Sequence, residues 1–300
     1  MPTISTPSKI NGTRKYTDHV IFSGSTSQER EEKVKEVVKE TGAILVPPYD
    51  HPDIILGQGS VGLELEEQFE ELERARKQNL HGIAGTTSNI TKTGVGTDVS
   101  WPATAPRRLN AVVAPIGGGG LLGGIATYFS RPSNTCEETD DKTFVFGAEP
   151  SFQGADDARR GLAMGKRIDT VKSLTIADGL RTPVGILNWK IVSDGRKVEA
   201  VYAVSEAEIK DAMRFVIERM KVVVEPSACV GLAMVLFNQE FRRWIAKKQE
   251  EEGKINGGVI RPWDVGVVFS GGNTTVEAIA HLFGGQENPI KREDTGIRSE

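Results

Sequence analysis

Four consecutive glycines, Gly117, Gly118, Gly119 and Gly120, are the residues of this sequence whose type and spacing could do chemistry. They follow the apolar residues 110–116 and precede the apolar residues 121–129, an order typical of a buried strand, a turn and the start of a helix. Glycine has no Cβ, so the backbone can approach an anion, and the helix N-terminus adds unpaired N–H groups and a positive dipole end. The pattern predicts a phosphate-binding loop, although glycine turns also join strands to helices without a ligand.

The same loop also satisfies a dinucleotide-binding pattern. Gly118, Gly120 and Gly123 have the spacing of G-x-G-x-x-G. The apolar stretch at residues 143–148 ends at Glu149, where a dinucleotide fold has its ribose-binding acid. Taken alone, this pattern would indicate an NAD-dependent oxidoreductase, but no second motif in the sequence supports that alternative.

Charge and composition exclude several classes of function. The chain has 300 residues and a net charge of −4 without a cluster of Lys and Arg, which argues against a nucleic acid or an anionic membrane as partner. Residues 1–11 are polar and no apolar run approaches ~18 residues, so we expect a soluble, cytoplasmic protein. Cys136 and Cys229 are too few for a disulfide framework or a zinc site.

Strands and helices that alternate along the chain must position the glycine loop. We expect strands at residues 19–22, 43–46, 110–116, 143–148 and 265–269. We expect helices at residues 27–40, 61–73, 205–220 and 226–247, and a last helix that Thr274 and Glu277 cap. A Gly-Gln-Gly turn at residues 57–59 precedes the second helix. This alternation predicts an α/β fold with a doubly wound parallel sheet.

The pattern divides the chain into four segments. Residues 1–73 predict a smaller α/β domain, and residues 110–283 predict the large α/β domain that carries the glycine loop. Residues 74–109 are interpreted as a low-order insertion, because most of them are rich in Gly, Thr and Ser and have no apolar period. The charged residues 284–300 predict a flexible tail.

Six motifs occur in the order that is found in one enzyme family. They are the glycine loop with Pro115 before it, Tyr49-Asp-His-Pro52 with Gly57-Gln-Gly-Ser60, Ala148-Glu-Pro150 with Ala155-Asp-Asp157, Ile176-Ala-Asp-Gly179, Glu225-Pro-Ser-Ala228 and Ser270-Gly-Gly-Asn273. Over about residues 8–283, apart from the insertion, the chain resembles serine racemase and the serine/threonine dehydratases. The resemblance implies pyridoxal phosphate (PLP) as cofactor and the tryptophan-synthase β-like fold, PLP fold type II. It also implies removal of the α-proton of serine or threonine, with β-elimination of water or racemisation.

The resemblance assigns the cofactor-binding residues. It implies that the N–H groups of Gly117 to Gly120 and of Leu121 bind the PLP phosphate, and that Gly179 lines the cofactor face. Ser270 would give the pyridine nitrogen a neutral hydroxyl partner. Such a partner leaves the ring a moderate electron sink, suited to α-proton removal more than to transamination.

A divalent cation site is implied as well. Glu149, Asp157 and the carbonyl of Ala155 fall where enzymes similar to serine racemase hold a cation. Oxygen ligands of this kind suit Mg²⁺ or Ca²⁺. The spacing from Glu149 to Ala155 is longer than in the animal racemases, and a solvated acidic loop is the alternative interpretation.

Two motifs of the family do not occur in these 300 residues. One is the Ser-Phe-Lys-x-Arg-Gly segment, whose lysine forms the Schiff base with PLP, and the other is a Ser-Ser-Gly-Asn-His loop. The residues around Lys9 match a later part of the family, so we assign no catalytic residue and expect no role for Lys9. The chain is therefore interpreted as N-terminally truncated, with residues 1–73 as the remnant of the small domain.

Three interpretations stay open at this point. The first is an enzyme, a PLP-dependent ammonia-lyase or amino-acid racemase. The second is a non-catalytic PLP-binding relic, or a regulatory partner of an intact homologue, because the Schiff-base lysine is missing. The third is the NAD-dependent oxidoreductase. A homodimer, or a complex with an intact homologue, is a further expectation from the family.

Overall fold

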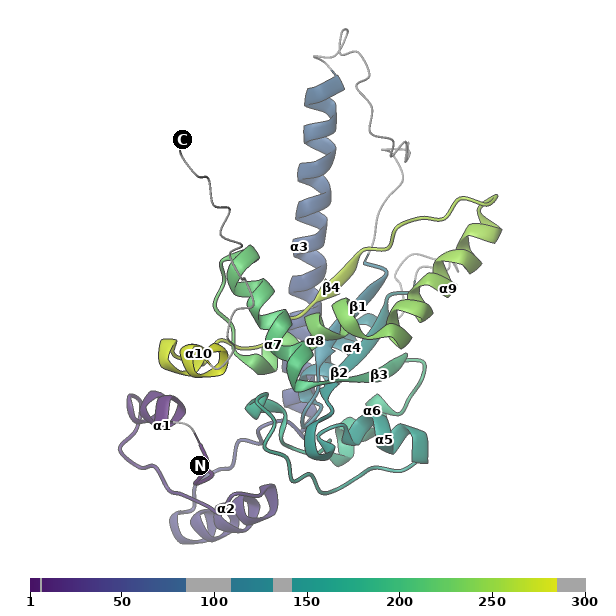
Figure 1. Ribbon diagram of the computed structural model, residues 1–300. Helices are drawn as coiled ribbons and strands as arrows, with labels where there is room; N and C mark the ends of the chain where they lie inside the picture. Colours follow the sequence, from purple (N-terminus) through teal and green to yellow (C-terminus); the bar gives the residue numbers. More distant parts are fainter. Residues whose placement is uncertain (6, 85–108, 132–141, 285–300) are drawn as a thin grey trace, which may run out of the picture.

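A parallel β-sheet with helices on both of its faces forms the centre of the computed structural model (Figure 1). The structure describes residues 1–5, 7–84, 109–131 and 142–284. Within these residues the sheet has the strand order β3-β2-β1-β4, and every pair is parallel. The strands are β1 (Ala111–Pro115), β2 (Phe144–Pro150), β3 (Ala200–Val204) and β4 (Val265–Val267). All residues of β1 are buried, as expected for an apolar strand that helices cover on both faces.

Alternate residues of β1 face two separate hydrophobic cores, because successive side chains of a strand point to opposite faces. Val112 and Ala114 pack with α3 (Pro52–Ala84), α4 (Gly120–Phe129), α5 (Asp157–Met164) and α6 (Ile186–Val192). Ala111 and Val113 pack with α7 (Glu206–Phe215), α8 (Pro226–Phe237), α9 (Gln239–Ile255) and α10 (Val276–Phe283). The predicted α/β fold with a doubly wound parallel sheet is therefore confirmed.

Two of the glycines in α3 and α4 allow these helices to pack closely along each other. A Cβ on Gly124 would lie 2.5 Å from the carbonyl oxygen of Ile55, and a Cβ on Gly62 would lie 2.8 Å from the Tyr128 ring. The turn predicted at residues 57–59 was wrong, because these residues lie inside α3. Packing against α4 offsets the low intrinsic helix propensity of glycine.

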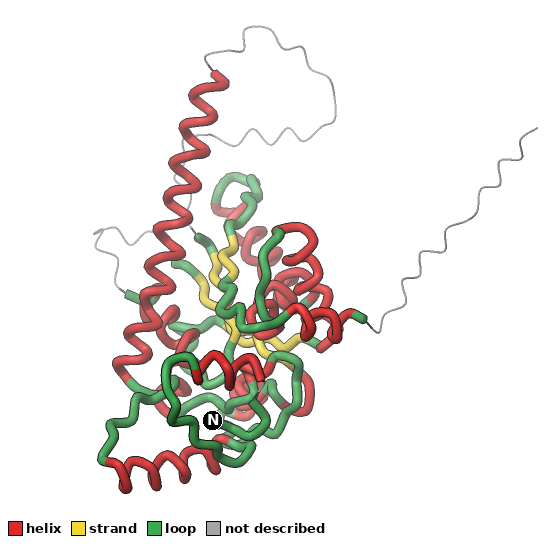
Figure 2. The backbone as a smooth tube through the Cα atoms, turned by 90° about the vertical axis from the view of Figure 1, so that its left-hand side faces the viewer, coloured by secondary structure: helices red, strands yellow, loops and turns green. Residues whose placement is uncertain are grey.

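The helix α3 extends well beyond the sheet in both views (Figures 1 and 2). It continues through residues 74–84, which are rich in helix-forming Arg, Lys, Gln and Leu, so the boundary predicted at residue 73 falls inside the helix. Residues 85–108 of the predicted insertion lie outside the described residues. In the described part of the chain, no helix is both long and apolar enough to cross a membrane.

The N-terminal part contains helices where we also expected strands. The helices are α1 (Pro7–Arg14) and α2 (Ser27–Thr41), and α2 begins at a capping box of Thr26 and Glu29. Residues 19–22 and 43–46 form no strand, so both strand predictions were wrong. A strand needs a paired neighbour, and Ile44 is 91% exposed. The described N-terminal residues therefore contribute one isolated bridge, Pro2 to Ser23, instead of a second sheet.

The C-terminal half follows the predicted elements with three corrections. The helix α7 begins where we expected a helix, at a capping box of Ser205 and Glu208. The helix predicted at residues 226–247 is two helices, because Asn238 ends α8 and accepts the N–H of Phe241 to begin α9. Thr275, and not the predicted Thr274, caps α10. The strand β3 did not stand out in the sequence, and residues 285–300 of the predicted tail lie outside the described residues.

Candidate functional site

The glycine loop lies at the carboxyl end of β1, the edge at which open α/β sheets bind ligands. Gly119 precedes α4 with a φ of 89°, in the left-handed region, and no side chain caps the helix. The first N–H groups of α4 therefore have no acceptor within the helix, as an anion site requires. Gly118 and Leu121 are partly exposed while the other glycines of the loop are buried, so the helix N-terminus is accessible at these two residues.

No position of the loop has room for a side chain. A Cβ at any of the four glycines would lie at 3.0 Å or less from another atom of the protein. The distances are 3.0 Å from Gly117 to Cα of Leu180, 2.5 Å from Gly118 to the Tyr49 ring, 2.9 Å from Gly119 to Cβ of Asn188 and 3.0 Å from Gly120 to the carbonyl oxygen of Tyr49. The loop thus presents backbone donors alone, and such donors suit an anion.

Asn188, which the sequence reasoning missed, holds the loop in place. It is fully buried in α6, and its Nδ2 donates to the carbonyl oxygens of Gly118 (2.9 Å) and Tyr49 (3.2 Å). The N–H of Gly185 donates to the same Gly118 carbonyl at 3.0 Å. The sequence signal that could have identified Asn188 is an Asn within an apolar helical stretch. Such an amide becomes buried and needs hydrogen-bond partners.

Asp50 connects the segment before α3 to the start of α6. Its carboxylate accepts the N–H groups of Ile186 (2.8 Å), Leu187 (2.9 Å) and Asn188 (3.1 Å). A carboxylate at a helix N-terminus satisfies orphan donors and favours the helix dipole. Asp50 belongs to a motif that the sequence analysis singled out, but its role became visible only from the tertiary contacts.

The structure places Gly179 and Ser270 at the same edge of the sheet as the loop. The carbonyl oxygen of Gly179 lies 3.2 Å from the Cβ position of Gly117. Ser270 follows β4, which pairs with β1 in the register Val113 to Val267, and the residue is exposed. The residues that the resemblance assigns to the cofactor thus gather at the carboxyl ends of two neighbouring strands.

The Glu225 carboxylate lies between the segments of these two residues. Its Oε1 is 3.8 Å from the Cβ position of Gly179 and is in direct contact with that of Gly271. Its Oε2 is buried and has no hydrogen-bond partner among the described residues. Burial raises the pKa of Glu225, the charge of Lys9 opposes this rise, and the charge of Asp178 adds to it.

Lys9 lies closer to this site than we expected. Its Nζ donates to Oδ2 of Asp178 at 2.7 Å, and Asp178 directly precedes Gly179 in the chain. Both side chains are partly buried. The expectation of no role for Lys9 overlooked this ion pair, because the pair joins α1 to a segment 169 residues away.

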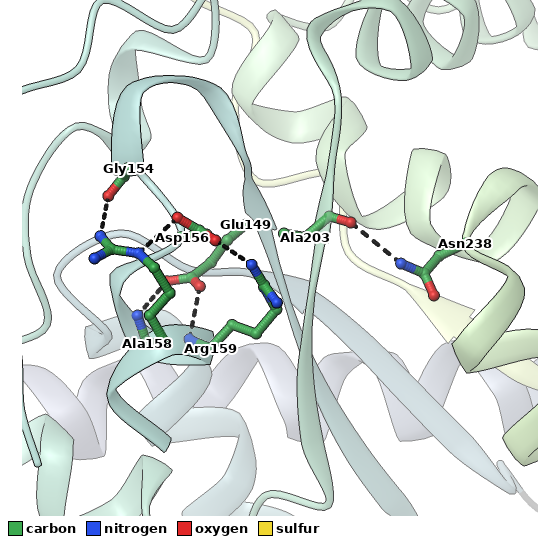
Figure 3. Close-up of polar contacts among 8 residues, drawn as sticks. Glu149, Gly154, Asp156, Ala158, Arg159, Ala203 and Asn238 are labelled. Carbon is green, nitrogen blue, oxygen red and sulfur yellow. Dashed lines mark hydrogen bonds and ion pairs between the residues drawn. The ribbon is translucent and has the colours of Figure 1, made fainter. Parts of the chain in front are cut away.

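Two of the predicted metal ligands, Glu149 and Asp157, accept hydrogen bonds within the protein. The two oxygens of Glu149 accept the N–H groups of Ala158 and Arg159, each at 3.0 Å, in the first turn of α5 (Figure 3). Oδ2 of Asp157 accepts the N–H of Val184 at 3.0 Å, and Ala155 is buried beside it. The described residues contain no group of three or more His, Cys, Asp or Glu that could hold a metal ion.

Glu149 and Asp157 are nevertheless unusual carboxyl groups. Both are almost fully buried. Burial raises the pKa of Glu149 well above its ordinary value, and the Asp157 charge adds to this. Burial likewise raises the pKa of Asp157 to about 6, and the N–H of Val184 opposes the rise. The neighbouring Asp156 binds Arg159 and Arg160 instead (Figure 3).

Known proteins similar to this chain include serine racemases and an ammonia-lyase. The family described as "Pyridoxal-phosphate dependent enzyme" matches residues 1–103 and 78–249. The serine racemase of Arabidopsis thaliana is 33% identical over 275 residues, which cover 92% of this chain and 65% of that protein. The L-threo-3-hydroxyaspartate ammonia-lyase of Saccharomyces cerevisiae is 31% identical over 289 residues, 96% of this chain and 68% of that protein. The structure of maize serine racemase, 30% identical, has a TM-score of 0.67 and matches 93% of this chain and 67% of that one. The chain thus spans about two thirds of the length of these relatives.

Proposed function

Because the chain belongs to the family of pyridoxal-phosphate-dependent enzymes, we propose that its glycine loop binds the phosphate of PLP and that the protein acts on a small hydroxy amino acid. The observation that carries the proposal is the uncapped N-terminus of α4 behind four glycines that leave no room for side chains. The relatives named serine racemase and hydroxyaspartate ammonia-lyase support α-proton removal, followed by elimination or racemisation.

Different residues of the site would bind the cofactor phosphate and position the cofactor ring. The loop N–H groups and that of Leu121 would hold the phosphate, while Asn188 fixes the loop through its hydrogen bond to the Gly118 carbonyl. Gly179 would leave the cofactor face free of a side chain, and the exposed Ser270 hydroxyl would serve as a neutral partner for the pyridine nitrogen. When bound, PLP supplies the electron sink for the charge that develops at the substrate Cα. A neutral partner at the ring nitrogen keeps that sink moderate, which favours elimination or racemisation of serine or threonine.

Cofactor binding is tested by titrating the purified protein with PLP and following the visible absorbance. Borohydride reduction and peptide mapping then locate any lysine that is joined to the cofactor. We expect saturable binding of one PLP per chain. Absence of saturable binding would contradict the cofactor proposal.

Turnover is tested separately, with L-serine, D-serine, L-threonine and 3-hydroxyaspartate as substrates. Release of keto acid and ammonia, or inversion at Cα, supports the catalytic proposal. Saturable PLP binding without turnover of any of these would favour the alternative, a PLP-binding protein that acts as regulator or partner of an intact homologue. The two measurements therefore separate the cofactor from the reaction.

A divalent cation at Glu149, the Ala155 carbonyl and Asp157 is the second part of the proposal. Two buried carboxyl groups close enough to interact are costly when both are charged, and a cation such as Mg²⁺ or Ca²⁺ offsets that cost. Each oxygen that accepts an N–H keeps a further lone pair for a metal.

Removal of the divalent cation tests the proposed metal site. We expect the melting temperature to rise with Mg²⁺ or Ca²⁺, by a few degrees, and to return to its original value with EDTA. The variant Asp157→Asn should lose the response, while Asp169→Asn, an exposed carboxylate elsewhere, should keep it. The same melting temperature with and without the ions would leave Glu149 and Asp157 as structural acceptors only.

A further inference from the structure

The segment 173–181 brings Gly179 to the edge of the sheet where the glycine loop lies. The structure describes all of these residues, and they form no strand and no α-helix, only the short turn η2 (Asp178–Leu180). The turn lies directly behind the loop, because the Cα of Leu180 is 3.0 Å from the Cβ position of Gly117. Backbone groups outside regular elements still need hydrogen-bond partners, so the position of this segment depends on the side chains that bind it.

The carboxylate of Glu206 binds two consecutive residues of this segment. Its Oε1 accepts the hydroxyl of Thr175 at 2.6 Å, and its Oε2 accepts the N–H of Ile176 at 2.8 Å. Thr175 is fully buried, and its Oγ1 in turn accepts the N–H of Ala177 at 3.2 Å. Hydrogen bonds to a charged acceptor are stronger than those to a neutral one. A single carboxylate thereby fixes three consecutive residues that lead into the turn of Gly179.

Glu206 reaches the segment from a well-packed element. It is the first residue of α7, which packs in the core through the fully buried Ile209, Ala212 and Met213. The helix dipole favours a carboxylate in the first turn of a helix. Side chains on a packed helix also hold their partners more precisely than side chains on a loop. The contacts of Glu206 therefore tie the irregular segment to a rigid part of the fold.

Two further contacts hold the same segment. Oγ of Ser227, a buried residue in the first turn of α8, accepts the N–H of Gly179 at 3.0 Å. Nε and Nη2 of Arg181 donate to the carbonyl oxygen of Thr175 at 3.1 and 2.7 Å. Ser227 thus fixes the turn itself, whereas Glu206 fixes the residues that lead into it. Loss of the Glu206 carboxylate would leave the N–H of Ile176 and the hydroxyl of Thr175 without these acceptors.

We propose that Glu206 is a positioning residue of the cofactor site, which acts through Thr175 and Ile176 to set the position of Gly179 and of the turn η2 behind the glycine loop. This inference rests on the proposed binding of PLP at that loop. Because η2 lies so close to Gly117, a shift of the segment alters two features together. It changes the face that Gly179 offers to the cofactor ring, and it changes the backbone that supports the phosphate loop.

The test compares the variants Glu206→Ala and Glu208→Ala of the full chain. Both remove a carboxylate from the first turn of α7, but Glu208 accepts the N–H and the hydroxyl of Ser205 within the capping box. Hydrogen–deuterium exchange without PLP measures the amides of residues 175–181. Titration with PLP then measures the affinity and the visible circular dichroism of the bound cofactor. The conservative variant Glu206→Gln keeps the length of the side chain and one acceptor oxygen.

In Glu206→Ala we expect exchange at residues 175–181 to become about tenfold faster and the PLP affinity to fall about tenfold, because two hydrogen bonds to a charged acceptor are lost. The visible dichroism of the bound cofactor should change as well. In Glu208→Ala both quantities should change less than about twofold, although the start of α7 is weakened. Glu206→Gln should recover part of the loss.

Equal exchange of residues 175–181 in the two alanine variants overturns the proposal. Faster exchange in Glu206→Ala with unaltered PLP affinity and dichroism overturns it as well, because Glu206 would then stabilise the segment without positioning the cofactor site. If the wild-type protein does not bind PLP, the cofactor proposal fails, and the exchange measurement alone decides whether Glu206 positions the turn of Gly179. If far-ultraviolet circular dichroism shows that Glu206→Ala is misfolded, Glu206→Gln decides by the same criteria.

Discussion

At the scale of single residues, Gly119 determines whether the loop can present its N–H groups. Its φ of 89° is costly for any residue with a Cβ, by about 1–2 kcal/mol. A Cβ there would also lie 2.9 Å from Cβ of Asn188, the residue that anchors the loop. Gly119 is therefore required twice, by the backbone conformation and by the packing of α6 against the loop.

The variant Gly119→Ala is expected to weaken PLP binding about tenfold or more and to lower stability by about 1–3 kcal/mol, because the backbone strain adds to the clash. PLP titration and urea denaturation measure the two effects. Gly195→Ala is the control, since a Cβ at Gly195 meets no atom within 4 Å. Unchanged PLP affinity in Gly119→Ala would show that the cofactor does not depend on this loop.

At the scale of elements, the position of α6 depends on a residue of another segment. No side chain of its own N-terminal residues caps α6, and Asp50 supplies the acceptor from before α3. Because Asn188 lies in the same first turn, the cap of α6 and the anchor of the glycine loop are coupled. The first turn of α6 therefore connects Asp50 with the glycine loop.

The variant Asp50→Ala is expected to cost about 1–2 kcal/mol of stability, as for loss of a helix cap, and to weaken PLP binding indirectly. Urea denaturation and PLP titration are again the measurements. Asp18→Ala removes an exposed carboxylate outside any helix and should leave both quantities unchanged. A loss of stability with unaltered PLP affinity would separate the cap from the loop and contradict the coupling.

At the scale of the whole molecule, Cys229 reports on the integrity of the core. It is fully buried in α8. Burial raises the pKa of its thiol to about 12, and the Glu225 charge adds to the rise. In the unfolded chain the thiol ionises near pH 9.0, so its contribution to stability is complete below that pH and is lost as the pH rises toward 12.

Alkylation with iodoacetamide at about pH 8.5 is expected to leave the Cys229 peptide unmodified in the native protein and to modify it fully in urea. Mass spectrometry quantifies this peptide separately from the peptide that contains Cys136. Rapid native modification of Cys229, with unchanged circular dichroism, would mean that α8 is not packed on the sheet as described.

The strands and helices that the sequence predicted correctly share a local cause. The apolar residues of β1 and β2 and the capping box of α7 act through neighbours in the chain, so their patterns were sufficient. The wrong predictions depended on distant partners. Residues 43–46 have the composition of a strand but pair with no strand among the described residues. Residues 57–59 form a helix in which Gly59 packs against Gly124 of α4.

The α/β class and the order of strand, glycines and helix at Gly117 to Gly120 follow from the chain alone, because local propensity and hydrophobic period set these features. The surroundings of the loop follow from the packing of the folded chain. Distant residues meet where Asn188 and Asp50 anchor the loop and α6, and where Glu225 lies between Gly179 and Gly271. Packing of helices on the sheet sets such contacts, and no periodicity of the chain encodes which side chains then meet.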